Sequence, residues 1–160
     1  MAVQIISIAV VIVIVIYFLK KEKTKEDAYF GEPKKYTKKE EKVLNHYKSI
    51  YKSLPNDSRF PAIKRNGYEL EDIAYTATQM IYDNPIPARD EIEEIEQGDL
   101  VKLLFVDDEG YVERMWVEVQ EKDGEIYKGL LRNDAFEFEG LKDGETIYFH
   151  SNHIYDIEKK

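Results

Sequence analysis

The chain has 160 residues, no cysteine and a formal net charge of -9, with 43% hydrophobic and 34% charged residues. This length suits one domain, and the apolar content is enough to bury a core, which argues against wholesale disorder. The lack of cysteine excludes disulfides, thiolate metal sites and a cysteine nucleophile, and the acidic balance argues against a nucleic-acid partner.

The charge divides the chain into three zones. Residues 1–19 carry no charged side chain, and residues 20–42 hold nine lysines against six acids. The remaining residues, 43–160, hold 14 basic and 26 acidic side chains. An apolar segment, a basic neck and an acidic body therefore follow one another.

The apolar segment, residues 2–19, contains only Gln4 and Ser7 as polar members. As a helix it would extend about 27 Å, close to the thickness of the bilayer core. A cleaved signal peptide fits less well, since no lysine or arginine precedes the run and no small-residue cleavage site follows it. A buried core helix is the other alternative, but such helices are not normally so uniformly apolar. We predict a single-pass transmembrane anchor over residues 1–19, in contact with lipid through residues 2–19.

The lysines after the span predict its orientation. Lys20, Lys21, Lys23 and Lys25 follow the apolar run at once. The positive-inside rule keeps such a flank in the cytoplasm, so we expect the body to face the cytosol. Residues 20–36 are interpreted as a charged tether. A polybasic lipid-binding patch is the alternative, which the interleaved acids weaken.

Residues 37–160 are expected to form one soluble α+β domain, with a helical part over 37–97. Its first helix begins at Thr37, where Glu40 completes a capping box, and its apolar stripe extends to residue 54. His46 lies beside this stripe among lysines and is interpreted as a surface residue.

A second amphipathic helix is predicted over residues 69–82, and Met80 in its apolar stripe is expected in the core. Residues 90–95 are expected to add a short acidic turn of helix. That acidic run is most simply a solvated face, although it can also attract a basic protein partner over long range.

From residue 98 the pattern changes to short runs rich in Val, Leu, Ile, Tyr and Phe. Asp-Gly pairs and similar turn residues separate the runs, and they favour hairpins because they accept positive φ. About five short strands with tight turns predict a small, strongly curved antiparallel sheet or an open barrel. The predicted strands cover residues 100–106, 112–119, 126–131, 146–149 and 154–157.

The second of these runs separates two faces by its alternation. Its Met and Val members point one way, whereas Arg114, Trp116 and Glu118 point the other. Trp116, the only tryptophan, is either covered by a helix or partly exposed as an anchor for a partner. Asn133 and Asp134 are most simply a turn cap, but would join a binding site if they lie beside Trp116. These five residues are the candidate binding residues.

Four motifs follow one another in the strand-rich part. They are Gly98-Asp99-Leu100-Val101-Lys102-Leu103, Glu113-Arg114-Met115-Trp116-Val117-Glu118-Val119, Gly129-Leu130-Leu131-Arg132-Asn133-Asp134 and Leu141-Lys142-Asp143-Gly144-Glu145. Together, over about residues 98–157, they resemble the uncharacterised YegJ-like domain family of bacteria, with Glu145 where that family has Asp. The resemblance implies a bacterial origin and a compact α+β domain. It brings no established activity, and some relatives look like accessory or immunity-type proteins.

The sequence contains no phosphate-binding glycine loop, no Gly-x-Ser-x-Gly and no His-Glu-x-x-His motif. We therefore predict a non-enzymatic protein- or peptide-binding module, accessory or immunity-type, without a cofactor. The alternative is a metal-binding protein or hydrolase-type enzyme that uses His150, His153 and Asp156. Residues three apart on a strand point to opposite faces, which weakens this alternative.

Overall fold

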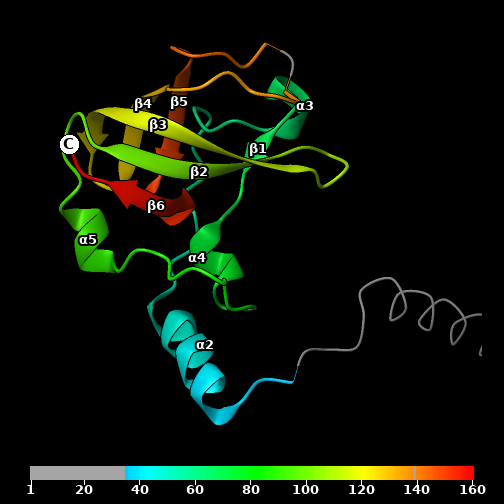
Figure 1. Ribbon diagram of the computed structural model, residues 1–160, viewed down its shortest axis with the longest axis vertical. Coiled ribbons are helices and arrows are strands. Elements are labelled where there is room, and N and C mark those ends of the chain that lie inside the picture. Colours follow the sequence, from blue (N-terminus) through cyan, green and yellow to red (C-terminus); the bar gives the residue numbers. More distant parts are fainter. Residues whose placement is uncertain (1–34, 139) are drawn as a thin grey trace, which may run out of the picture. The chain divides into compact units, whose positions relative to one another are not determined.

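The computed structural model describes residues 35–138 and 140–160. The chain divides into two units, Met1–Thr37 and Lys38–Lys160, and every helix and strand described here belongs to the second (Figure 1). In chain order the elements are α2 (Lys38–Ile50), α3 (Ile63–Asn66), β1 (Glu69–Leu70), α4 (Ile73–Thr76), α5 (Arg89–Glu93), β2 (Leu100–Val106), β3 (Val112–Asp123), β4 (Ile126–Leu131), β5 (Thr146–His150), the 3₁₀ turn η1 (Ser151–His153) and β6 (Ile154–Glu158).

Five of the strands form an antiparallel, nearly closed barrel-like sheet (Figure 1). β2, β3, β4 and β5 pair in succession, and β6 pairs with the edge of β2 opposite β3. The turn η1 carries the chain directly from β5 at one edge of the sheet to β6 at the other, which brings the two edges together. β1 extends the same edge of β2 through the pairs Glu69–Val106 and Leu70–Phe105. The fold is α+β, as predicted.

The core lies inside the barrel because alternate strand residues point inward. On β3 the buried side chains are Met115, Val117 and Val119, as the alternation predicted. Tyr127 of β4 stacks on Phe149 of β5, with 5.2 Å between ring centroids and 7° between ring planes. Burial of these apolar side chains is the main favourable contribution to folding of the barrel.

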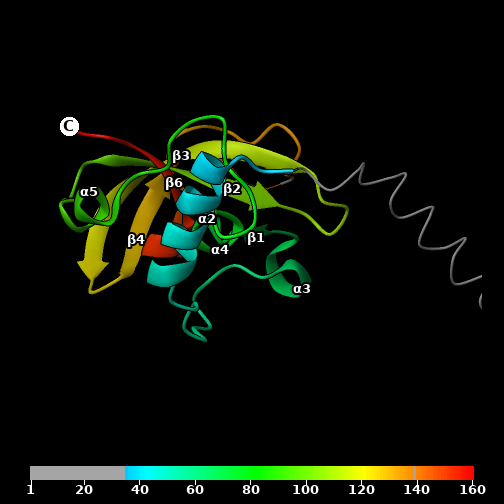
Figure 2. The ribbon, with the colours of Figure 1, turned by 90° about the horizontal axis from the view of Figure 1, so that it is seen from below.

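A second, smaller apolar cluster lies outside the barrel. Leu104 of β2 and Tyr155 of β6 are buried against Ile73 of α4, and Tyr82 and Ile86 pack at the margin. Seen from below, α2 crosses in front of α4 and β6 (Figure 2). The helices α2 and α4 and the segment that follows α4 therefore gather on one side of the barrel.

The five predicted strands are confirmed. β2 and β4 have the predicted bounds, β3 continues past residue 119 to Asp123, and β5 and β6 each extend by one residue. Gly124, in the turn between β3 and β4, has a φ of 62°, the positive value that this tight turn requires. The predicted acidic turn of helix is α5.

The helix predicted over residues 69–82 is wrong. Its first two residues form β1 instead, because the end of β2 offers them backbone partners. Asp72 then begins the short α4 by accepting a hydrogen bond of 2.9 Å from the Tyr75 N–H, a capping role that Asp favours over a helix interior. Met80 lies beyond α4 and is 44% exposed, so its predicted place in the core is also wrong.

α2 ends at Ile50 rather than at residue 54. Beyond the end of the helix the chain makes a tertiary contact, because the Lys52 carbonyl accepts a hydrogen bond of 2.9 Å from the Asn152 side chain. This hydrogen bond joins the segment after α2 to the turn η1 between β5 and β6. His46, on α2, is exposed as predicted.

Within residues 35–138 and 140–160, no helix combines the length and the apolar character needed to cross a bilayer. The predicted anchor, residues 2–19, lies outside the described residues, as does the predicted tether up to residue 34.

Candidate functional site

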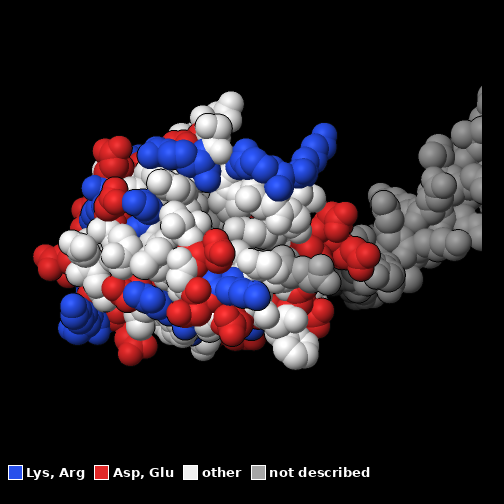
Figure 3. All heavy atoms as spheres, turned by 90° about the horizontal axis from the view of Figure 1, so that it is seen from above, with Lys and Arg blue, Asp and Glu red and all other residues white. Residues whose placement is uncertain are grey.

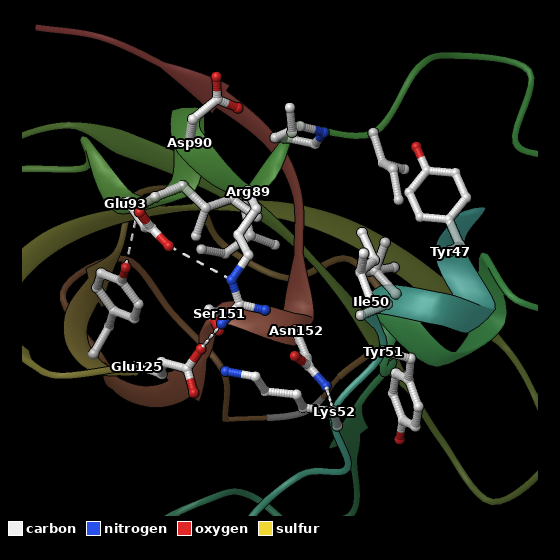
Figure 4. Close-up of a pocket in the computed structure, with 18 of the residues that line it drawn as sticks. Tyr47, Ile50, Tyr51, Lys52, Arg89, Asp90, Glu93, Glu125, Ser151 and Asn152 are labelled. Atoms are coloured by element: carbon white, nitrogen blue, oxygen red, sulfur yellow. Dashed lines mark hydrogen bonds and ion pairs between the residues drawn. The ribbon is translucent and has the colours of Figure 1, made fainter. Parts of the chain in front are cut away.

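A pocket of about 430 Å³ lies between α2, α4, α5, η1 and the β3–β4 hairpin (Figure 4). Pockets that bind small molecules commonly have volumes of about 300 to 1,000 Å³. No single stretch of sequence builds this pocket, because its walls come from both halves of the domain.

The floor of the pocket is apolar. Ile73, Tyr127 and Ile154 line it and are themselves buried. Ile50 stands at its α2 side and is 40% exposed. Covering such exposed apolar surface is favourable by about 25 cal/mol per Å². The pocket is therefore suited to an apolar group.

The rim of the pocket is charged. Arg89, the first residue of α5, points toward the pocket between two carboxylates (Figure 4). Its guanidinium pairs with Glu125, and its Nε lies 3.5 Å from Glu93 Oε1. The second carboxylate oxygen of Glu125 lies 3.7 Å from His150 Nε2. Both signs of charge therefore stand beside the apolar floor, where a few polar groups can orient a ligand.

The turn η1 binds the segment that follows α2. Asn152 is buried, and its side-chain amide donates to the Lys52 carbonyl across 100 positions of sequence. Its backbone N–H donates to His150 Nδ1 at 3.1 Å. These bonds fix the wall of the pocket nearest to the end of α2.

A second pocket of about 230 Å³ adjoins the first. Tyr47 and Ile86 line both pockets and form the wall between them. Val43 and Met80 line the second pocket and are 37% and 44% exposed. The two pockets together, from Val43 at one end to Ile50 at the other, are named here the α2 groove.

His150 and His153 lie close together, but each accepts a backbone hydrogen bond. His153 Nδ1 accepts the N–H of His150 at 2.9 Å, and His150 Nδ1 accepts the N–H of Asn152. Asp156, the third residue of the predicted metal alternative, pairs with Lys102 at 2.9 Å instead. Among the described residues, no three His, Cys, Asp or Glu side chains come together as metal ligands do.

Burial governs the titration of both histidines. Desolvation, with a smaller effect of His150, lowers the pKa of His153 to about 3. Desolvation also lowers the pKa of His150, against the opposing effect of Glu125. Ser151 Oγ lies 3.3 Å from His150 Nδ1, whose lone pair already accepts the N–H of Asn152, so the hydroxyl has no free base beside it. This geometry gives the hydrolase-type alternative little support.

Trp116 lies half-buried on the outer face of β3. Lys102 of the adjacent strand places its Nζ 4.2 Å from the indole centroid, a favourable cation–π contact. Asn133 accepts the backbone N–H of Trp116 at 3.1 Å, and Asp134 accepts the N–H of Asp143 at 3.1 Å. The structure therefore brings Asn133 to Trp116, but as a support for the backbone.

The other two candidate residues of that face are also held by neighbours. Glu118 pairs with Arg132 at 2.7 Å. The Arg114 guanidinium lies 5.5 Å from the Tyr155 ring centroid. These side chains already have partners within the fold, whereas the α2 groove leaves apolar surface uncovered.

The sequence interpretation missed the α2 groove. Arg89, Glu125 and Asn152 come from three segments that only the topology brings together. One signal did exist, because apolar residues recur along α2 at helical spacing. Only Leu44 of that helix is buried, while Val43 and Ile50 remain exposed.

Residues 74–158, just over half of the chain, match a bacterial family, DUF2314, whose description reads "Uncharacterized protein conserved in bacteria". Neither the curated proteins nor the solved structures contain a match to the chain. The predicted resemblance to an uncharacterised bacterial domain family is thereby confirmed, and the match begins at residue 74 rather than near 98. The matched residues include α5 and all five barrel strands, whereas α2 lies before them in the chain.

Proposed function

The chain belongs to the DUF2314 family of uncharacterised bacterial proteins, and we propose that it is a non-enzymatic recognition module that binds an apolar segment of a partner protein or peptide. We further propose that residues 2–19 anchor it in a membrane with its domain in the cytosol. The α2 groove carries the first proposal, because two adjoining apolar pockets share Tyr47 and Ile86 as their dividing wall.

Two adjoining pockets favour a peptide over a compact small molecule. A peptide presents side chains at regular intervals, so one chain can fill both pockets at once. The exposed side chains Val43 and Ile50 lie on the same helix, at opposite ends of the groove. Arg89 and Glu125 pair with each other at the rim, and the hydrogen-bonding capacity that this pair leaves over can serve the polar backbone of such a segment.

Filling the first pocket is expected to weaken peptide binding. Random peptides displayed on phage are selected against the full chain in lipid nanodiscs, and the enriched sequences are expected to share two large apolar residues at constant spacing. Ala74→Phe places a ring in the pocket that Ala74 lines. Loss of one buried apolar side chain costs about 1.5 to 3 kcal/mol, so the selected peptide is expected to bind at least about tenfold more weakly in calorimetry.

A charge at the second pocket provides an independent measurement. Val43→Asp is expected to weaken the same peptide about tenfold, because it places a carboxylate at an apolar contact. Asn45→Asp is the matched control, since this exposed residue of α2 lines neither pocket. Melting temperatures show whether each variant folds. The proposal is contradicted if the selection gives no consensus. It is also contradicted if the peptide binds the folded Ala74→Phe and Val43→Asp variants with the same affinity as it binds the parent chain.

Membrane orientation is a separate expectation. An epitope tag placed after Lys160 is expected to survive protease added to cells of which only the outer membrane surface is accessible. The tag is expected to be cut once the membrane is opened, because the lysines after residue 19 favour the cytosolic side. Cleavage without opening would place the domain outside and contradict the cytosolic orientation.

A further inference from the structure

A second apolar patch lies at the start of β3. Tyr111, Val112 and Phe136 are 42%, 44% and 87% exposed. Single exposed apolar residues are common on protein surfaces, but grouped ones mark interaction sites. Phe136 exposes nearly its whole ring, which burial against a partner would cover.

The fold holds this patch together. Glu113 of β3 accepts the backbone N–H of Phe136 at 2.9 Å and that of Glu137 at 3.3 Å. Phe138 packs against the barrel core and lies 6.2 Å from Tyr111, measured between ring centroids. The loop that carries Phe136 is therefore bound to the β2–β3 hairpin, at the residue that follows Val112 on β3.

Carboxylates surround the patch. The Tyr111 N–H donates to Asp107 Oδ1 at 2.8 Å, and Glu113 holds the Phe136 loop, so two of these acids lie at the patch. Partial desolvation raises the pKa of the Tyr111 phenol, and the charges of Glu137, Glu113 and Asp107 raise it further. Acidic side chains gather where the β2–β3 hairpin projects from the molecule (Figure 3). The three apolar residues and these three acids are named here the hairpin surface.

We infer that the hairpin surface docks a protein partner whose contacting face carries Lys or Arg side chains around an apolar recess. Phe136 enters the recess as an aromatic anchor, and the carboxylates pair with the cations at the rim of the recess. An anionic membrane is repelled by these carboxylates, and a second copy of the chain would set like charges against each other. A protein with a basic contact face is therefore the partner whose charge complements the hairpin surface.

This surface is independent of the α2 groove. β3 runs from Val112 to Asp123, roughly 36 Å in extended form, and the groove is lined by Lys122 near the far end of the strand and by Glu125 just beyond it. The inference therefore goes beyond the proposed function and stands whether or not the groove binds a peptide.

Photo-crosslinking in bacterial cells that produce the full chain tests the inference. Benzoylphenylalanine replaces Phe136 or, as the control, Glu121, an exposed residue near the other end of β3 that lines neither pocket of the α2 groove. Ultraviolet light is expected to give a protein adduct from position 136 and none from position 121. Mass spectrometry is expected to find the adduct in a segment rich in Lys or Arg. A synthetic peptide of that segment is expected to bind the full chain at least about tenfold more weakly at about 500 mM than at about 50 mM salt.

Matched variants separate specific docking from general charge attraction. Glu137→Lys is expected to lower the adduct yield at least about fivefold, whereas Glu121→Lys, at an exposed carboxylate near the other end of β3, leaves it unchanged. Phe136→Ala is expected to weaken the peptide about tenfold with an unchanged melting temperature, because the ring is exposed. The inference is overturned if the adduct forms with lipid, with a second copy of the chain or with an acidic segment. It is also overturned if both positions give equal adducts or if position 136 gives none.

Discussion

Gly129→Ala is expected to lower the free energy of unfolding by about 3 kcal/mol. A Cβ at this position of β4 would lie 2.4 Å from Val117 Cγ1 and 2.6 Å from the Glu118 carbonyl oxygen. That oxygen belongs to the backbone of β3 and cannot move without disturbing the strand pairing, and the close-packed core leaves no space for the methyl group. Urea unfolding of the full chain, followed by the fluorescence of its single tryptophan, measures the loss.

Gly124→Asn is the matched control in the same hairpin. Gly124 has a φ of 62°, which Asn tolerates, and a Cβ there meets nothing within 4 Å. This variant is expected to cost less than about 1 kcal/mol. Similar losses for the two variants would contradict a steric cause, because only Gly129 lies against another strand.

Lowering the pH from 7 to 5 is expected to destabilise the domain by about 2 kcal/mol through His153. Its pKa is about 3 in the fold, below the 6.5 of an ordinary histidine. Below pH 6.5 the unfolded chain therefore binds a proton that the native state does not. The contribution is fully present above pH 6.5 and is lost as the pH falls toward 3, while the lowered pKa of His150 acts in the same direction.

His153→Asn tests the source of this pH dependence. The amide oxygen can accept the His150 N–H as Nδ1 does, but it does not titrate. Urea unfolding of this variant is expected to show a much smaller change in free energy between pH 7 and pH 5. His46→Asn, at an exposed histidine, is expected to keep the full change. An unaltered pH dependence in His153→Asn would show that this imidazole is not its source.

The barrel strands were predictable because their signal is local. Alternating apolar residues and Asp-Gly turns give each strand its length and its buried face without knowledge of its neighbour. The helix predicted over residues 69–82 failed for the opposite reason. Its apolar spacing is equally local, but backbone pairing with β2 and the cap at Asp72 outweighed it, and both depend on the folded environment.

The sequence by itself therefore determined the α+β class, the strands of the barrel, the inward face of β3 and the bacterial family. Only the tertiary structure decided where uncovered apolar surface lies. The Asn152 amide donates to the Lys52 carbonyl in the wall of the α2 groove, and the Phe136 N–H of the loop donates to Glu113 in the hairpin surface. Such contacts join distant segments, and periodicity along the chain carries no information about which distant segments meet.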